Sequence, residues 1–269
     1  MKITFLGTGT SCGVPTLGCS CKVCRSTNPH DSRLRCAALV ETDTTRLLID
    51  CGPDIRQQLM PLPFRRIDGV LLTHMHYDHV GGIDDLRPYC RFGTIPLYGD
   101  CKTLRHVRQS MPYCFPHGLM QRIEKSLPWL KLKLYPGVPS LSLNPIHAHR
   151  PFSVGDIEVL PINVLHGKLP ILGFRIGRNF AYITDMKSMS EDELHYLKGV
   201  RTLVVNALRF EKPHHSHQLV ADAVAFAHKV GAEQTWLIHF NHDIGLETEA
   251  QAKLPRNVGL AYDGLEIEV

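Results

Sequence analysis

The chain has 269 residues, of which 43% are hydrophobic and 21% are charged, and its formal net charge is +4. This length allows one large domain or two small ones, and the apolar fraction is sufficient for a buried core. The small positive charge suits an anionic substrate but falls short of a nucleic-acid-binding surface, which needs clustered basic residues. No apolar run reaches the ~18 residues of a membrane span, and the apolar stretch after Lys2 ends too early, at Gly7, for a secretory signal. We expect a cytoplasmic protein without membrane or nucleic-acid partners.

The first 111 residues predict short strands that end in Gly-containing turns, with two helices between them. The strand that precedes residue 74 is expected to begin at Val70, because Gly69 is a weak strand former. The segment 37–41 is expected to pair with 46–50. The predicted strands cover 2–6, 37–41, 46–50, 70–73 and 96–98, and the predicted helices cover 55–60 and 102–111.

The second half predicts more strands and one long amphipathic helix, 219–230, which ends at Gly231. Residues 112–150 are rich in Pro, Tyr and His without periodicity, so they form either a substrate-covering insertion or a surface loop. Many strands with few, widely separated helices favour sheets flanked by helices over a regular βαβ alternation. We therefore expect one α/β domain over 1–269. The predicted strands here cover 157–162, 172–176, 180–184, 202–205, 235–238 and 264–269.

A dense group of potential metal ligands directly follows the apolar run that ends at Thr73. His74, His76, Asp78 and His79 lie within six residues, and imidazole and carboxylate are ligands that divalent metals such as zinc prefer. His74 and His76 point the same way if the strand continues, whereas the chain has to turn at Asp78 and His79. The spacing indicates two ligands for one metal and two for a second metal close by.

Three further candidate ligands follow predicted strands elsewhere in the chain. His166 follows the strand that begins at Ile157, Asp185 follows 180–184, and His239 follows 235–238. A single His or Asp after a strand is more often a turn or cap residue. Given the first cluster, however, strand ends are suitable places to gather ligands at one edge of a sheet.

Other histidines compete for roles in this site. His147 and His149 lie between prolines and lack an adjacent Asp-His pair, so we do not include them. His214, His215 and His217 form a group before the long helix. One of these three could act as a proton donor, or all could simply be solvated residues at the helix start.

Nine cysteines are present, an odd number, and three of them are Cys19, Cys21 and Cys24. In a chain without an export signal, this spacing favours metal binding over disulfides. Buried free thiols are the alternative.

Taken together, these motifs resemble the metallo-β-lactamase superfamily, whose fold is a four-layer αββα sandwich. The resemblance spans nearly the whole chain in the right order. Gly13-Val-Pro15 followed by the cysteine motif, with His166-Gly-Lys-Leu169 and Ala261-Tyr-Asp-Gly264, is similar to the PhnP branch of cyclic phosphodiesterases. The superfamily motifs are Leu6-Gly-Thr-Gly-Thr10, Ile49-Asp-Cys-Gly52, the His74 to His79 cluster, His166, Asp185 and His239.

The resemblance implies a role for each of these residues. His74, His76 and His166 would hold one metal, Asp78, His79 and His239 a second, and Asp185 would bridge the two. Cys19, Cys21, Cys24 and His242 would hold a separate structural zinc, and three thiolates plus one imidazole are a closed tetrahedral set. Asp50 would orient a ligand histidine, and His217 or His215 would act as general acid.

The expected reaction is hydrolysis of a small, cyclic phosphodiester by a hydroxide held between two divalent ions, zinc or manganese. Two such ions, two aspartates and one hydroxide leave a net charge near +1, which suits a phosphodiester monoanion. The alternatives are a thioester, lactone or β-lactam hydrolase, or a non-hydrolytic protein of the PqqB type. Residues 112–150 are longer than the branch leads one to expect, and the arm with which ribonuclease Z grips transfer RNA is not evident. A homodimer is compatible with the sequence.

Overall fold

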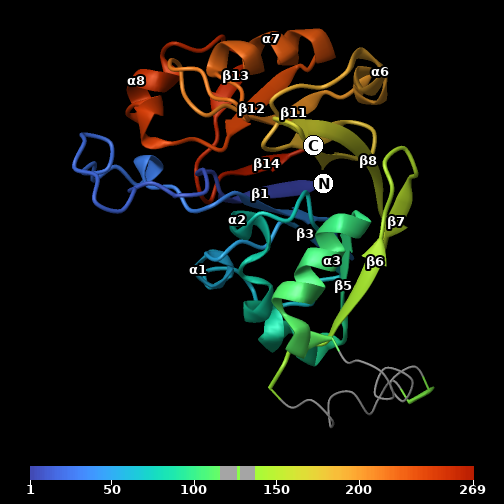
Figure 1. Ribbon diagram of the computed structural model, residues 1–269. Helices are drawn as coiled ribbons and strands as arrows, with labels where there is room; N and C mark the ends of the chain where they lie inside the picture. The colour runs from blue at the N-terminus through green and yellow to red at the C-terminus, as the bar shows by residue number, and fades with distance from the viewer. Residues whose placement is uncertain (116–125, 128–136) are drawn as a thin grey trace.

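The computed structural model describes residues 1–115, 126–127 and 137–269. Across these ranges the strands form two seven-stranded sheets that pack face to face (Figure 1). The first sheet has the order β14-β1-β2-β3-β4-β5-β6, with β14 Glu266–Glu268, β1 Lys2–Gly7, β2 Ala37–Glu41, β3 Arg46–Ile49, β4 Gly69–Leu71, β5 Ile95–Gly99 and β6 Leu141–Pro145. The second has the order β13-β12-β11-β10-β9-β8-β7, with β13 Val258–Leu260, β12 Gln234–Ile238, β11 Thr202–Asn206, β10 Phe180–Ile183, β9 Leu169–Ile176, β8 Ile157–His166 and β7 Phe152–Val154.

Helices cover the outer face of each sheet. Figure 1 shows α1, α2 and α3 on the side of the first sheet and α6, α7 and α8 on the side of the second. The α-helices are α1 Ile55–Leu59, α2 Tyr77–Val80, α3 Cys101–Ser110, α6 Glu191–Leu194, α7 Val220–Val230 and α8 Glu247–Gln251. The 3₁₀ helices are η1 Pro29–Asp31, η2 Ile83–Phe92, η3 Pro112–Cys114, η5 His195–Leu197 and η6 His242–Ile244.

Three layers of buried apolar side chains hold this arrangement together. One lies between the two sheets and contains Phe5, Phe174 and Tyr182, all fully buried. The other two lie under the helices on the outer faces. Strands buried on both faces explain the continuous apolar runs in the sequence, because neither face meets water. The predicted αββα sandwich is confirmed.

The two sheets are joined by backbone hydrogen bonds near the ends of β1, β4 and β12. Thr10 N donates to Phe240 O at 2.8 Å, and Phe240 N donates to Thr8 O at 3.1 Å. Leu172 N donates to Thr73 O at 3.0 Å. The segments that follow β4 and β12 are therefore fixed against the opposite sheet, and these segments carry His74 and His239.

Several predicted boundaries differ from the structure. The prediction that the fourth strand starts at Val70 is wrong, since Gly69 already pairs with Leu47. A Cβ atom at this position would lie 2.8 Å from the ring of Tyr98, so a larger residue would displace that ring. β8 is longer than predicted and ends at His166. The short strands β6, β7 and β13 and the short helices α6 and α8 were not predicted.

The predicted insertion at 112–150 is described only in part. η3 and β6 lie within it, and β6 pairs in parallel with β5 as the edge of the first sheet. Residues 116–125 and 128–136 lie outside the described residues, so a substrate-covering insertion stays a prediction. In the described part of the chain, no helix combines the length and apolarity needed to cross a bilayer.

The carboxylate of Asp263 binds the segment before β14 to the two segments that contain Thr8 and Leu34. Its carboxylate accepts hydrogen bonds from Leu34 N at 2.6 Å and Thr8 Oγ1 at 2.8 Å. Burial raises the pKa of Asp263 from 3.8 to about 6, although these hydrogen bonds and Arg33 lower it. Between pH 4 and 6 the carboxyl group of Asp263 is therefore still protonated in the folded protein but already ionised in the unfolded chain. The free energy of unfolding that Asp263 contributes falls as pH rises through this range.

We predict that the stability of the wild type relative to Asp263→Asn decreases between pH 4 and 7, by on the order of 2 kcal/mol. Urea unfolding at several pH values measures this difference. Asp43→Asn, in the exposed turn between β2 and β3, is the control and should show no such trend. A pH-independent difference for Asp263→Asn would contradict the raised pKa.

Candidate metal centre

The histidine motif lies where β4 leads into the short helix α2. His74 lies three residues after the end of the strand at Leu71, His76 precedes the helix in an extended conformation, and Asp78 and His79 lie within the helix. His74 Nε2 and His76 Nδ1 face each other at 2.9 Å. The chain therefore turns where the sequence predicted, and His74 and Asp78 project from a strand end and a helix start toward the same space.

Asp185 is the residue on which the other ligands converge. Its Oδ2 lies 3.9 Å from Nε2 of both His74 and His166. Its Oδ1 lies 3.4 Å from His79 Nε2 and 3.1 Å from His239 Nδ1. The two oxygens of one carboxylate thus face two different pairs of histidines, one pair on each side.

Three strands that supply the site end in an unusual backbone conformation. Asp50 after β3, Asp185 after β10 and His239 after β12 have φ of 60°, 55° and 63°. Non-glycine residues seldom adopt this left-handed region, and Asp and His are among those that do so most readily. Such conformations persist where surrounding contacts hold them and often mark functional sites. Here each one redirects the chain at a strand end, and the side chains of Asp185 and His239 meet at 3.1 Å.

Asp50 contacts the ring of His79 on the side that faces away from Asp185. It is fully buried, and its Oδ2 accepts the Nδ1–H of His79 at 2.7 Å. Thr73 N donates to Asp50 Oδ1 at 2.9 Å. The arrangement fixes the tautomer of His79, so that Nε2 is left to face Asp78 at 3.3 Å and Asp185.

Close backbone packing brings α2 against the turn after β3. A Cβ atom on Gly52 would lie 2.0 Å from Asp78 O, and one on Gly82 would lie 2.0 Å from Gly52 O. Cys51 N donates to His79 O at 2.8 Å. Glycine at these two positions is what allows Asp50 to reach His79.

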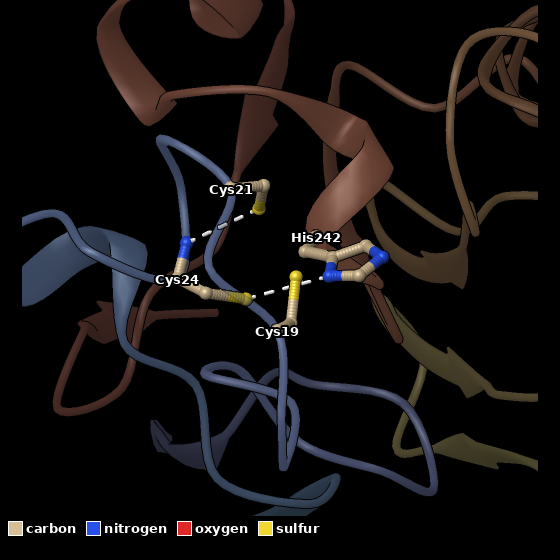
Figure 2. A group of neighbouring side chains, drawn as sticks. All are labelled: Cys19, Cys21, Cys24 and His242. Carbon is tan, nitrogen blue, oxygen red and sulfur yellow. Dashed lines mark hydrogen bonds between the residues drawn. The ribbon is translucent and has the colours of Figure 1, made fainter.

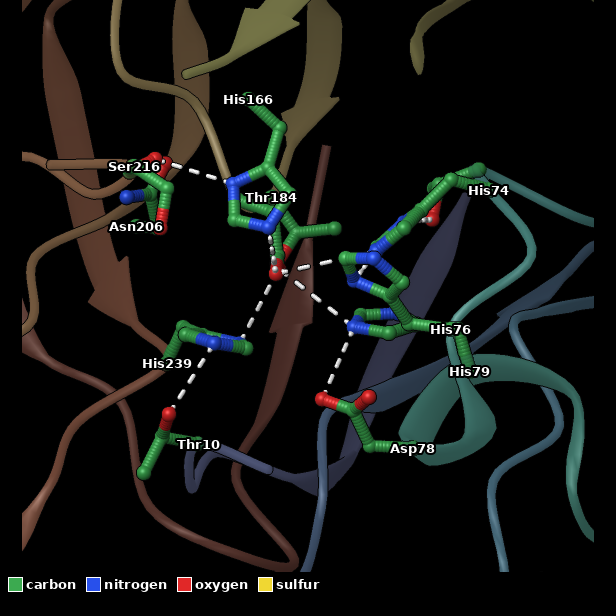
Figure 3. Close-up of polar contacts among 12 residues, drawn as sticks. Thr10, His74, His76, Asp78, His79, His166, Thr184, Asn206, Ser216 and His239 are labelled. Carbon is green, nitrogen blue, oxygen red and sulfur yellow. Dashed lines mark hydrogen bonds and ion pairs between the residues drawn. The ribbon is translucent and has the colours of Figure 1, made fainter. Parts of the chain in front are cut away.

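The other ligand histidines also have a second partner on the ring nitrogen that points away from Asp185. His166 Nδ1–H donates to Ser216 O at 2.9 Å. His239 Nε2 lies 3.2 Å from Thr10 Oγ1, and His74 Nδ1 lies 3.0 Å from Thr73 Oγ1. Such outer partners hold metal-binding imidazoles in place. Figure 3 shows the rings of His166, His79 and His239 and the carboxylate of Asp78 directed toward one another.

The electrostatics of the cluster favour ionised carboxylates, neutral rings at His74 and His239, and a protonated ring at His79. Burial lowers the pKa of His74 and of His239. Burial raises the pKa of Asp185, but His239 and His79 lower it by more, so that it lies well below its usual range. Burial lowers the pKa of His79, but Asp185 and two further carboxylates raise it well above its usual value. This concentration of negative charge is what a divalent cation would neutralise.

The donor set fits two cations. His79 Nε2 and His239 Nδ1 are buried and have no hydrogen-bond partner among the described residues, although carboxylate oxygens lie within 3.4 Å. Close approach without hydrogen-bond geometry is expected of atoms that face a shared ion rather than each other. Groups whose ligand atoms lie within 4.8 Å of one another are His74, His76 and His166; His74, His79 and Asp185; and Asp78, Asp185 and His239.

The sulfur cluster forms a second, separate group. The ligand atoms of Cys19, Cys21, Cys24 and His242 lie within 4.8 Å of one another (Figure 2). Cys24 Sγ lies 3.4 Å from His242 Nδ1, and no disulfide joins cysteines in the described part of the chain. Four such donors fit a tetrahedral zinc ion. Because His242 starts η6, three residues after His239, this cluster links the loop after β1 to the segment that carries a ligand of the first site.

Comparison with known proteins gives the family of this chain. Residues 45–240 match the family described as "Beta-lactamase superfamily domain". A curated relative from Porphyromonas gingivalis is 41% identical over 267 residues, which is 99% of this chain. The chain belongs to the metallo-β-lactamase superfamily. That relative is named "Octanoyltransferase", and the chain spans about half of it, 51% of its length.

Solved structures of the superfamily support the predicted branch. A structure described as a new diphosphatase from the PhnP family is 34% identical, with a TM-score of 0.86 over 100% of this chain and 97% of the other. Zinc-bound PqqB from Methylobacterium extorquens covers 100% of both chains at a TM-score of 0.78 and 20% identity, which shows a shared fold. The predicted resemblance to PhnP is confirmed. The donor clusters are groups that could hold metal ions.

The two candidate general acids of this metallo-β-lactamase-fold protein lie in different environments. The ring of His217 is buried, with its centre 4.7 Å from that of His166 and 4.8 Å from that of His239. His217 also belongs to a ligand-competent group with His166 and Asp185. His215 is exposed and lines a cavity of about 680 Å³ beside the cluster, together with His76, His166, Gly167, Lys168, Leu169, Lys187 and Ser216.

Sequence reasoning missed two contributors to the site, Thr10 and Lys187, and left His147 and His149 out of it. Thr10 contacts His239, and Lys187 lines the cavity beside the cluster. Thr10 belongs to a recognised motif, whereas Lys187 has no spacing signal of its own. His149 instead binds Glu193 at 2.9 Å and stacks on Tyr196.

We predict that Cys21→Ser lowers the zinc content by about one equivalent and reduces the melting temperature by several degrees, because a structural zinc contributes directly to folding free energy. Elemental analysis and calorimetry measure the two effects. Cys12→Ser changes an exposed cysteine outside the cluster and should alter neither. If Cys21→Ser retains all its zinc and its melting temperature, this cluster is not a zinc site.

Proposed function

We propose that the chain is a metal-dependent phosphodiesterase that hydrolyses a small, cyclic phosphodiester. The observation that supports this most strongly is the carboxylate of Asp185, whose two oxygens face separate pairs of histidines. A single carboxylate between two imidazole pairs is suited to bridging two cations. When bound, two divalent ions such as zinc or manganese would activate water as a nucleophile at neutral pH and offset negative charge on phosphorus.

The residues of the chain supply orientation and a proton. Asp50 and Ser216 hold the rings of His79 and His166. His217 is the better placed general acid, because its buried ring lies against His166 and His239, whereas His215 is exposed on the cavity wall. Burial lowers the pKa of His217 to about 2, so the resting ring is a neutral imidazole. In the proposed reaction this ring takes up the proton that the attacking water releases and gives it to the departing alkoxide, which leaves the imidazole neutral again. An alkoxide is a poor leaving group, so this proton transfer accounts for much of the rate.

The cavity beside the cluster supports an anionic substrate. Its charged side chains are those of Lys168 and Lys187, and histidines make up much of the remaining lining. The negative groups of the site, Asp78 and Asp185, belong to the ligand cluster itself. A phosphodiester monoanion would therefore approach the metal ligands past positive and imidazole side chains.

Acyl compounds are the competing substrate class. Thioester and lactone hydrolases use less leaving-group assistance, because a thiolate or an activated ester departs more readily than an alkoxide. The name of the Porphyromonas gingivalis relative describes acyl transfer, but about half of that protein lies outside the match. A buried histidine over the cluster favours the phosphodiester. A third possibility is a non-hydrolytic protein of the PqqB type.

We predict that the protein, loaded separately with zinc and with manganese, hydrolyses bis(p-nitrophenyl) phosphate and a cyclic alkyl phosphodiester in preference to nitrocefin or an acyl thioester. Release of p-nitrophenol, chromatography of the phosphate product, the absorbance change of nitrocefin and thiol release measure the four rates. Metal content is determined on the same samples. Phosphodiesterase inactivity with a full metal complement would overturn the proposed function, and faster thioester cleavage would assign the site to acyl compounds.

A further inference from the structure

The segment 214–218, which carries His217, forms neither helix nor strand. Its position therefore depends on individual hydrogen bonds to its backbone. Ser216 O accepts the Nδ1–H of the ligand His166 at 2.9 Å, and Gln218 N donates to Met186 O at 3.2 Å. Between these two anchors, His217 O accepts a hydrogen bond from Lys187 Nζ at 3.2 Å.

The ring of His217 has little to orient it apart from this backbone. Its Nδ1 is buried and has no hydrogen-bond partner within the described ranges. The remaining constraints are ring contacts, at 4.7 Å to His166, 4.8 Å to His239 and 5.0 Å to His214. Ring contacts define a plane less strictly than hydrogen bonds do, so the backbone at His217 decides where the ring lies over the cluster.

The backbone of Lys187 is itself hydrogen-bonded to β8. Its backbone N donates to Leu165 O at 2.7 Å, one residue before the ligand His166. It also lies two residues after Asp185, on the segment that leaves β10. Its side chain is half-buried, where a charge-assisted hydrogen bond is stronger than one exposed to water. One short segment thus supplies both the central carboxylate of the cluster and the ammonium group that holds His217.

We propose that Lys187 is a positioning residue for proton transfer. Its ammonium group fixes the carbonyl of His217 and so keeps the imidazole over the cluster, within reach of the leaving oxygen. This inference rests on the proposed function, in which His217 protonates the leaving alkoxide. In this role Lys187 acts by holding the backbone of His217. That role differs from attracting an anionic substrate, which would need only the positive charge of Lys187.

Lys168 offers a matched control for that distinction. It lines the same cavity, but it is exposed at the turn between β8 and β9. No hydrogen bond joins its side chain to residues 214–218 in the part of the chain that the structure describes. Lys168→Met therefore removes the same charge from the same cavity as Lys187→Met does, and leaves the carbonyl of His217 bound.

The test compares two substrates that differ in their need for a proton. Bis(p-nitrophenyl) phosphate releases a stable phenolate, whereas glycerol 1,2-cyclic phosphate releases an alkoxide. In the metal-loaded protein we expect Lys187→Met to lower kcat for the cyclic substrate at least about tenfold, with a change below about threefold for the aryl substrate. Lys187→Arg keeps a donor and should restore most of the rate, and His217→Ala should show the same selective loss, about a hundredfold. Lys168→Met should leave the ratio of the two rates unchanged.

A second readout does not depend on activity. Hydrogen–deuterium exchange of a peptide that spans 214–218 should be faster in Lys187→Met than in the wild type or Lys168→Met, with the melting temperature preserved. Equal losses on both substrates, unchanged exchange, or the same selective loss in Lys168→Met would overturn the positioning role. If the wild type cleaves neither phosphodiester, the proposed function fails, while the exchange experiment still decides whether Lys187 holds this segment. If His217→Ala shows no selective loss, His217 is not the acid and the inference fails with it.

Discussion

The site depends on a buried, ionised carboxylate at the end of β10. Asp185 is 2% exposed, and four histidine nitrogens lie within 3.9 Å of its two oxygens. A desolvated carboxylate is costly unless positive charge or hydrogen bonds compensate it. His239 and His79 lower the pKa of Asp185 by more than burial raises it, and divalent cations held by the same ligands would compensate the charge further. The left-handed conformation of Asp185 and its hydrogen bond from Thr184 Oγ1 at 2.7 Å hold the carboxylate in this position.

The αββα architecture explains why the site forms only in the folded chain. The first sheet supplies the cluster that follows β4, and the second supplies His166, Asp185 and His239. Hydrogen bonds between the segments after β4 and β12 and the opposite sheet bring the two halves together. Metal binding and sheet packing are therefore expected to stabilise each other, because the ligands converge only when both sheets are in place. The sulfur cluster adds a further link between the two halves, because it joins the loop after β1 to His242, three residues after His239.

Much of this site could be predicted because its signals are local. His74, His76, Asp78 and His79 are nearly contiguous, and the remaining ligands follow runs that are recognisable as strands. The four cysteine-cluster residues were predicted as one group, and the structure brings them together. The buried apolar runs likewise indicated the sheets. The observed bounds of β2 and α7 agree closely with the predicted ranges 37–41 and 219–230.

Other features depend on packing that leaves no periodic signal. Gly69 pairs with Leu47 in β4 and lies close under the ring of Tyr98, and strand propensity shows neither contact. β7 and β13 have three residues each and are defined by their neighbours. The sequence favoured His217 and kept His215 as an alternative, since only the path of 214–218 separates a buried ring from an exposed one. The contact of Lys187 is with a backbone carbonyl, so no side-chain pattern could reveal it.

The central claim is that Asp185 lies between two cations. Anomalous diffraction from crystals of the zinc-loaded protein, recorded at the zinc edge, tests it most directly. The account predicts two peaks in the histidine–aspartate cluster, one beside each oxygen of Asp185, and a third peak among Cys19, Cys21, Cys24 and His242. A single peak in the cluster under zinc excess, with one oxygen of Asp185 free of metal, would contradict it.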